Sequence, residues 1–204
     1  NRSLSIRIAK FGARSVEVAG ALTNRAAMKY KTDLADAIAD LEQGRKIFES
    51  QAKPDEPKLA LVNTNIAIAY FMQVMSVGSN DNPWVKVAAA DAIIKAGEAA
   101  QRSVDLRRKF LQPGDKDLRS SQLVLGMTSL LADDAKKAIA AFQESLEGAG
   151  GIPNDGYLTS FSELMLSVTY ANENQDDLSI LWGKEAVNTL QGERGDAESL
   201  HPVL

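Results

Sequence analysis

The amino-acid sequence predicts an all-α fold. Apolar residues recur at intervals of three and four, as in Leu34, Ile38 and Leu41, so each segment has one apolar face. No segment alternates apolar and polar residues as a half-buried strand does. The β-branched clusters, such as Val62 with Ile66, lie in alanine-rich stretches of high helix propensity. Helices are therefore expected throughout the chain.

Regular breaks divide the chain into these helices. They are rich in Gly, Pro, Asn and Asp, and they lie at 32–33, 53–57, 78–83, 112–115, 148–156, 172–176 and 191–192. Asn82 followed by Pro83 predicts a helix start, because Asn caps the first turn and Pro is tolerated there. Pro113 and Gly114 predict the end of the same helix, which could run about 45 Å from Asn82 to Gln112.

The first 18 residues are expected to form a basic arm or a first helix with a solvated basic face. Arg2, Arg7, Lys10 and Arg14 all precede the first acidic residue, Glu17. Such a segment suits docking on an acidic partner or peripheral association with a membrane, and its composition resembles the tail of an organellar targeting peptide. A processed chain in an organelle (plastid or mitochondrion) or periplasm is therefore slightly favoured over a cytoplasmic one.

The composition suits one compact domain or one short solenoid, because the 204 residues are 45% hydrophobic. We expect a helical domain over 19–192 and a C-terminal tail over 193–204. The formal charge of −4 argues against nucleic acid as a partner of the chain as a whole. Uninterrupted apolar runs fall short of the roughly 18 residues that span a bilayer, so no transmembrane segment is expected.

No catalytic or metal-binding constellation is predicted. The chain has no Cys, and its only His, His201, lies in the Pro-containing tail, where a general base or metal ligand would not be held in place. No nucleophile motif of the G-x-S-x-G type occurs. The glycine-rich stretch at 148–151 lacks the Lys and Ser or Thr of a phosphate-binding loop. We expect a non-catalytic protein that needs no cofactor and no metal.

The stretch 123–143 contains the most distinctive pattern in the chain. A Leu125-Gly126 pair is followed by an acidic break and then by Ala138-x-x-x-Phe142. The stretch 24–47 has the same order: a helix rich in small residues, a break at 32–33, and a second helix with alanine and leucine four residues apart. Two helices joined by a short turn are therefore expected in each.

Both stretches resemble the tetratricopeptide repeat, a helix-turn-helix unit of about 34 residues. The clear units lie at about 19–52 and 119–151, and two degenerate ones at about 58–111 and 157–192. The resemblance implies antiparallel helical hairpins stacked as a short right-handed solenoid with a concave binding face. The basic clamp with which some family members grip acidic C-terminal tails is not complete in this sequence.

The resemblance implies a protein–protein interaction scaffold, or a peripheral or adaptor subunit of a multi-subunit complex, that binds through the concave face or the basic arm. The candidate partner-binding residues are Arg7, Lys10, Arg14, Asn24, Arg25, Lys29, Asn65, Trp84, Arg107 and Arg108. Arg107 and Arg108 would equally suit the negative end of a helix dipole.

Trp84 supports a second hypothesis. With Phe71, Met72 and Met75 it is expected in the core at helical spacing, although an exposed cluster of these residues would make a binding surface. The alternative function is therefore an exported helical sensory or solute-binding domain, with a pocket between hairpins near Trp84.

Overall fold

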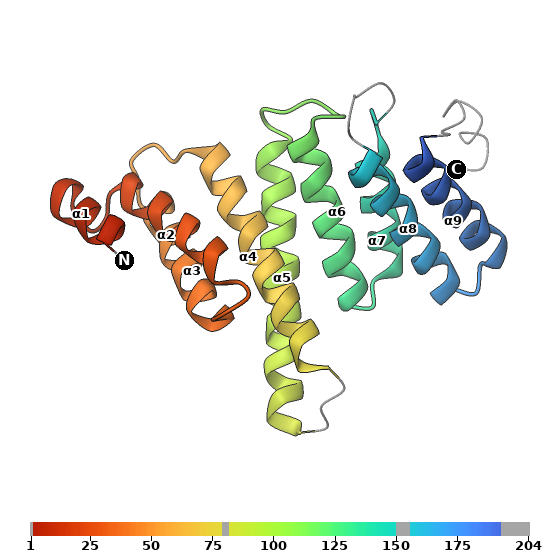
Figure 1. The fold of residues 1–204 in the computed structure, drawn as a ribbon, viewed down its shortest axis with the longest axis horizontal. Coiled ribbons are helices and arrows are strands. Elements are labelled where there is room, and N and C mark those ends of the chain that lie inside the picture. The colour runs from red at the N-terminus through yellow and green to blue at the C-terminus, as the bar shows by residue number, and fades with distance from the viewer. Residues whose placement is uncertain (1, 79–81, 150–155, 193–204) are drawn as a thin grey trace. The chain divides into compact units, whose positions relative to one another are not determined.

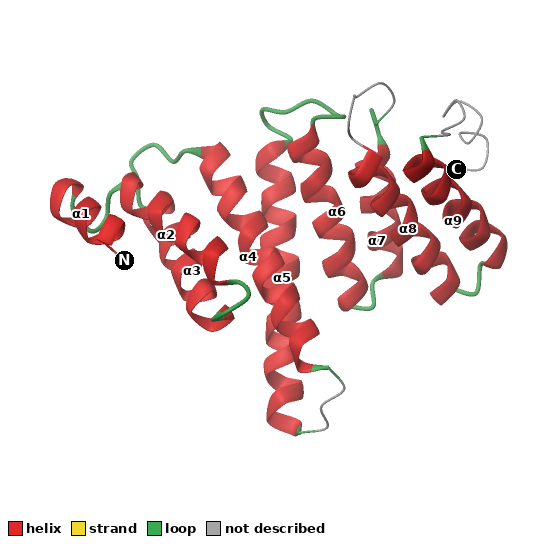
Figure 2. Ribbon diagram, viewed as in Figure 1, coloured by secondary structure: helices red, strands yellow, loops and turns green. Residues whose placement is uncertain are grey.

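A computed structural model describes residues 2–78, 82–149 and 156–192, and these residues contain nine helices and no strand (Figures 1 and 2). The all-α prediction is confirmed for this part of the chain. The helices are α1 (Arg2–Phe11), α2 (Val16–Lys29), α3 (Leu34–Glu49), α4 (Glu56–Val77), α5 (Pro83–Arg107), α6 (Lys116–Leu131), α7 (Ala135–Leu146), α8 (Gly156–Asn172) and α9 (Asp176–Gln191). His201 and the predicted tail lie outside the described residues.

The chain divides into two compact units, unit 1 (Asn1–Phe110) with α1–α5 and unit 2 (Leu111–Leu204) with α6–α9. Within unit 1, α2 packs against α3, α4 packs against α5, and α3 joins the two pairs by contacting α4. Unit 2 has the same plan, because α6 pairs with α7, α8 pairs with α9, and α7 contacts α8. Each unit is therefore built from helices that are neighbours in the sequence.

Side-chain caps set the helix starts where the sequence predicted them. Asn82 accepts a hydrogen bond from the backbone N–H of Trp84, and Pro83 is the first residue of α5. Asp33 caps α3 and Asp134 caps α7 by accepting from the backbone N–H three residues on. The breaks at 32–33 and 132–134 are thus turns followed by N-caps.

Glycine allows the closest helix contact in unit 2. A Cβ atom placed on Gly126 of α6 would lie 2.3 Å from Cε1 of Phe142 in α7, far inside van der Waals contact. Phe142 is fully buried, and it packs in a core with Leu123, Leu166 and Trp182. The Leu-Gly pair and the later Phe are therefore two halves of one packing arrangement.

A buried arginine also joins three helices of unit 2. Arg119 of α6 is fully buried; its Nε donates to the carbonyl of Ser145 in α7 at 2.5 Å, and its Nη2 donates to the Thr159 hydroxyl in α8 at 3.0 Å. A buried guanidinium needs such acceptors, because burying it away from water without hydrogen bonds costs on the order of several kcal/mol. These hydrogen bonds fix how α7 and α8 lie against α6.

Helix α4 is long and apolar enough, by length and composition alone, to cross a membrane, whereas no such segment was expected from the sequence. In the structure, 44% of its most apolar 18-residue window is buried. Its buried Thr64 lies 2.7 Å, oxygen to oxygen, from the buried hydroxyl of Ser103 in α5. Core helices of globular domains have the same length and composition, and α4 is packed as one of them.

Candidate protein-binding site

A hollow of about 330 Å³ lies between α1 and α2 in unit 1. We call it the α1–α2 hollow. The residues that line it are Ser3, Leu4, Arg7, Ala21, Asn24, Arg25 and Met28. Arg7, Asn24 and Arg25 belong to the predicted partner-binding set, so the structure brings three of its ten residues to one place.

A tight turn between α1 and α2 forms this hollow. Gly12 adopts a positive φ of 85° just after α1, a conformation that glycine accepts without strain. Its N–H donates to the carbonyl of Ile8 at 2.9 Å, and the Ser15 hydroxyl then caps α2 by accepting from the N–H of Val18. The chain therefore reverses within a few residues, and α1 lies against α2 (Figure 1).

Helix α1 is held only lightly in this position. None of its residues is buried, and its Ile6, Ile8 and Phe11 are 56%, 41% and 45% exposed. Leu4 and Arg7 are half-buried, and they line the hollow. The α1 wall of the hollow can thus adjust to a ligand more easily than the α2 wall can.

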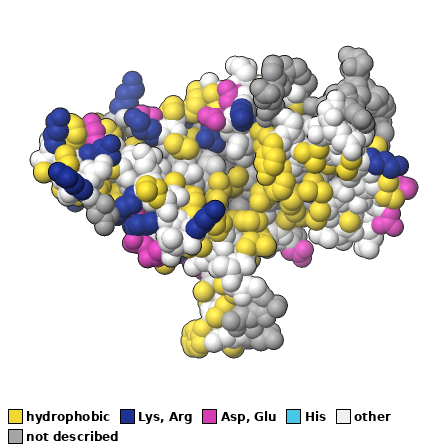
Figure 3. All heavy atoms as spheres, viewed as in Figure 1, with side chains coloured by type: hydrophobic (Ala, Val, Ile, Leu, Met, Phe, Trp, Pro, Cys, Tyr) yellow, Lys and Arg dark blue, Asp and Glu magenta, His cyan; other side chains and the backbone are white. Residues whose placement is uncertain are grey.

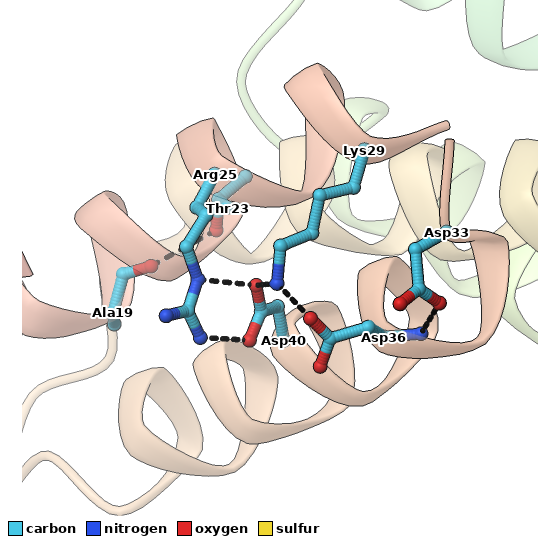
Figure 4. Close-up of polar contacts among 7 residues, drawn as sticks. All are labelled: Ala19, Thr23, Arg25, Lys29, Asp33, Asp36 and Asp40. Atoms are coloured by element: carbon cyan, nitrogen blue, oxygen red, sulfur yellow. Dashed lines mark hydrogen bonds and ion pairs between the residues drawn. The ribbon is translucent and has the colours of Figure 1, made fainter. Parts of the chain in front are cut away.

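The α2 wall is held by a network of ion pairs with α3 (Figure 4). Arg25 donates from Nε to Asp40 Oδ2 at 2.6 Å and from Nη2 to Oδ1, a two-point contact. Lys29 pairs with Asp36 and, at 3.2 Å, with Asp40 Oδ2. Asp40 is only 3% exposed, so it joins two cations of α2 from within the interface.

Hydrogen bonds in this network favour the charged forms of Arg25, Lys29 and Asp36. The hydrogen bond from Arg25 to Asp40 raises the pKa of the guanidinium. The hydrogen bond between Lys29 and Asp36 raises the pKa of the ammonium and lowers that of the carboxyl group. The two-point contact with Asp40 holds Arg25 at the edge of the hollow.

The lining can bind an acidic group beside an apolar one. No acidic side chain lines the hollow, and Arg7 forms no ion pair within the described part of the chain. Arg7 and the Asn24 amide therefore offer donors to a carboxylate. Leu4, Ala21 and the 83% exposed Met28 supply apolar surface next to these donors.

Other predicted residues lie apart from this hollow. Lys10 is exposed, with its Nζ 5.1 Å from the centre of the Phe11 ring. Arg14 follows α1 and lines a separate hollow of about 390 Å³ with Lys46 of α3. Asn65 of α4 is half-buried, and its carbonyl accepts a hydrogen bond from the hydroxyl of Tyr30 at 3.2 Å.

The prediction of a buried Trp84 is wrong. Its side chain is 82% exposed and Met75 is 60% exposed, whereas Phe71 and Met72 are half-buried. Both exposed residues lie near the ends of α4 and α5, where helical spacing does not by itself provide a packing partner. A ring so open to solvent does not line an enclosed pocket.

Arg107 also requires a correction. It is 6% exposed, and its Nη1 donates to the Thr64 hydroxyl of α4 at 2.9 Å, so it belongs to the core and is not available to a partner. The local sequence shows no sign of this burial, because the hydroxyl that accepts the hydrogen bond from Arg107 lies 43 residues earlier in the chain. Arg108 is exposed at the end of α5, where it pairs with Asp105 at 4.0 Å.

Asp40 is the residue that the sequence analysis missed. Arg25 and Lys29 are four residues apart on α2, and Asp36 and Asp40 are four residues apart on α3. Such spacings place each pair on one side of its own helix, and in the structure these two sides face each other. Matching charges across the turn would have identified this network, and would have shown that Lys29 is occupied within the fold.

Comparison with known proteins found no family model that matches the chain and no curated protein with significant sequence similarity. The described residues also contain no group of three or more His, Cys, Asp and Glu side chains arranged to hold a metal ion. Charge, exposure and shape therefore carry the functional argument.

Proposed function

We propose that this protein is a non-catalytic scaffold or peripheral subunit built from tetratricopeptide-like hairpins, and that it binds a protein partner at the α1–α2 hollow. The observation that carries the proposal is the convergence of Arg7, Asn24 and Arg25 around a hollow with no acidic side chain. The expected ligand is a segment of the partner that presents a carboxylate next to an apolar side chain.

The repeat assignment is supported by equivalent packing in the two clear units. Each has an aspartate N-cap after the turn, at Asp33 and Asp134. Each also has a fully buried alanine four residues after the cap and a fully buried large apolar residue four residues later: Ala37 and Leu41 in one unit, Ala138 and Phe142 in the other. Small residues at such contacts are what the tetratricopeptide pattern requires.

The rigid α2 wall supports a binding role for the hollow. Arg25 is already oriented by Asp40, so a ligand would not have to order this side chain on binding. Arg7 sits on the adjustable α1 wall, and it can close on the carboxylate. Binding of this kind should weaken with added salt, because an exposed ion pair is screened over about 10 Å at 0.1 M ionic strength.

A capture experiment tests the proposal. The wild-type protein and an Arg7→Glu variant are immobilised and exposed to an extract of the native source, and Lys184→Glu on α9 serves as a control with the same change of charge at another exposed site. We expect a stoichiometric partner that Arg7→Glu loses and Lys184→Glu keeps. Because Arg7 is outside the core, circular dichroism should show both variants folded.

Two results would contradict the proposal. A partner that binds Arg7→Glu and wild type equally would place the interface elsewhere. Binding of wild type to anionic vesicles, lost in Arg7→Glu and with no protein captured, would assign the hollow and α1 to a membrane surface instead.

A further inference from the structure

The far ends of α4 and α5 form an apolar projection from unit 1. We call it the α4–α5 tip, and it comprises the described residues 71–77 and 83–94. Figure 1 shows the two helices extending well past the ends of α2 and α3, and Figure 3 shows hydrophobic side chains along one side of this projection. Met75, Trp84, Val87 and Ile94 are 60%, 82%, 64% and 61% exposed.

The tip exists because α4 and α5 are longer than the helices they pack beside. They have 22 and 25 residues, whereas α2 and α3 have 14 and 16. The turn between α2 and α3 reaches α4 at Asn65, where Tyr30 donates its hydrogen bond. Residues 71–77 continue for about two further helical turns. Of the hydrophobic residues in the tip only Ala92 is fully buried, so this extra length adds mainly exposed apolar surface.

The tip is also close to neutral. Lys86 and Asp91 are the only charged residues in the two segments, and their charges cancel. Val87 and Ile94 are seven residues apart, so they share one side of α5 with Ala90 and with Asp91, whose carboxylate pairs with Lys95. A small side chain such as that of Ala90 lets another helix approach closely, to the distance of about 8–10 Å between axes that is typical of packed helices.

We propose that the α4–α5 tip binds a second copy of this chain and makes the protein a reversible homodimer. The four exposed side chains present about 500 Å² per copy, so a symmetric contact would bury about 1,000 Å², the lower limit for a specific interface. Tryptophan and methionine are enriched in such interfaces, and charged residues are depleted. The charges of the two described segments cancel, so these segments add little repulsion between copies and little attraction to an anionic lipid surface.

Sedimentation velocity over a range of protein concentrations tests the dimer. The mass of the purified chain should rise from 22.0 kDa toward twice that value. Trp84→Ala should raise the apparent dissociation constant of the dimer about tenfold or more, as loss of a central tryptophan does in other interfaces. Val87→Glu should have a similar effect through charge repulsion. Tyr157→Ala, which removes a 79% exposed aromatic residue from unit 2, should leave dimerisation unchanged.

Tryptophan fluorescence supplies an independent measurement. The chain has two Trp residues, and Trp182 is 6% exposed whereas Trp84 is 82% exposed. The emission of wild type should shift to shorter wavelength as concentration rises, and Trp84→Phe should abolish this shift. The proposal is overturned by a single monomer mass with constant emission at all concentrations. It is overturned equally by a dimer that Tyr157→Ala disrupts and Trp84→Ala does not, or by a monomer whose Trp84 emission shifts only with added vesicles.

Discussion

Replacing Gly126 by alanine should destabilise unit 2, although glycine-to-alanine changes in helices usually stabilise. Alanine gains about 1 kcal/mol in intrinsic helix propensity. The new Cβ, however, would lie 2.3 Å, 2.5 Å and 2.7 Å from three ring carbons of Phe142. Carbon atoms pack at about 3.5–4.0 Å, so the fully buried ring must move by more than about 1 Å. Overpacking of this kind costs about 1–3 kcal/mol, and we expect a net loss.

Urea unfolding followed by the fluorescence of Trp182 measures this loss, because that residue lies in the core of unit 2. Gly97→Ala in α5 of unit 1 is the control, since a Cβ there meets no atom within 4 Å and should stabilise by about 0.5–1 kcal/mol. Because Trp182 reports on unit 2, the unfolding of this control is followed by far-ultraviolet circular dichroism. Replacing the ring with a smaller side chain, in the double variant Gly126→Ala with Phe142→Leu, should recover part of the lost free energy of unfolding. If Gly126→Ala were as stabilising as Gly97→Ala, the proposed contact between Gly126 and Phe142 would be refuted.

Three further predictions concern unit 1. Burial raises the pKa of Tyr30 to about 12, so its neutral form favours folding; this stability is complete below pH 10 and is lost as pH rises from 10 to 12. Tyr30→Phe should therefore flatten the fall in melting temperature over that interval, and an unchanged slope would contradict the assignment. Asp40→Asn should cost about 1–3 kcal/mol in urea unfolding, toward the lower end because the Arg25 side chain is 25% exposed; a loss below about 0.5 kcal/mol would show that the pair is unimportant. Lys29 lowers the pKa of Asp36, so that carboxylate stabilises the fold above its unfolded pKa of about 4 and loses this effect as pH falls below it. Melting temperatures of Asp36→Asn between pH 7 and 3 should fall less steeply than those of wild type, and parallel curves would count against the ion pair.

The helices could be predicted from the sequence because their ends are set by local chemistry. The caps at Asn82 and Asp134 depend on a side chain and a backbone N–H two or three residues away. The contact between Gly126 and Phe142 was also predictable, since a repeated pattern records how two adjacent helices pack.

Errors arose where distant parts of the chain decide exposure. Arg107 has a charged side chain of the kind that normally faces water, but the structure supplies it with a buried acceptor on another helix. Trp84 has a large apolar side chain of the kind found in cores, but α4 and α5 extend past the helices that would have covered it. Among the site residues, charge alone identified Arg7 and Arg25, but it could not show which of them a carboxylate within the fold already holds.

The pairing of neighbouring helices has a consequence for how the chain folds. Each described helix packs mainly against the one before or after it in the sequence, so contacts close short loops and lose little chain entropy. Such topologies fold quickly, and a domain can form while the residues that follow it are still being synthesised. On the ribosome, unit 1 can therefore complete its core before unit 2 emerges. A substitution in unit 1 such as Asp40→Asn would then destabilise the nascent chain before synthesis is complete.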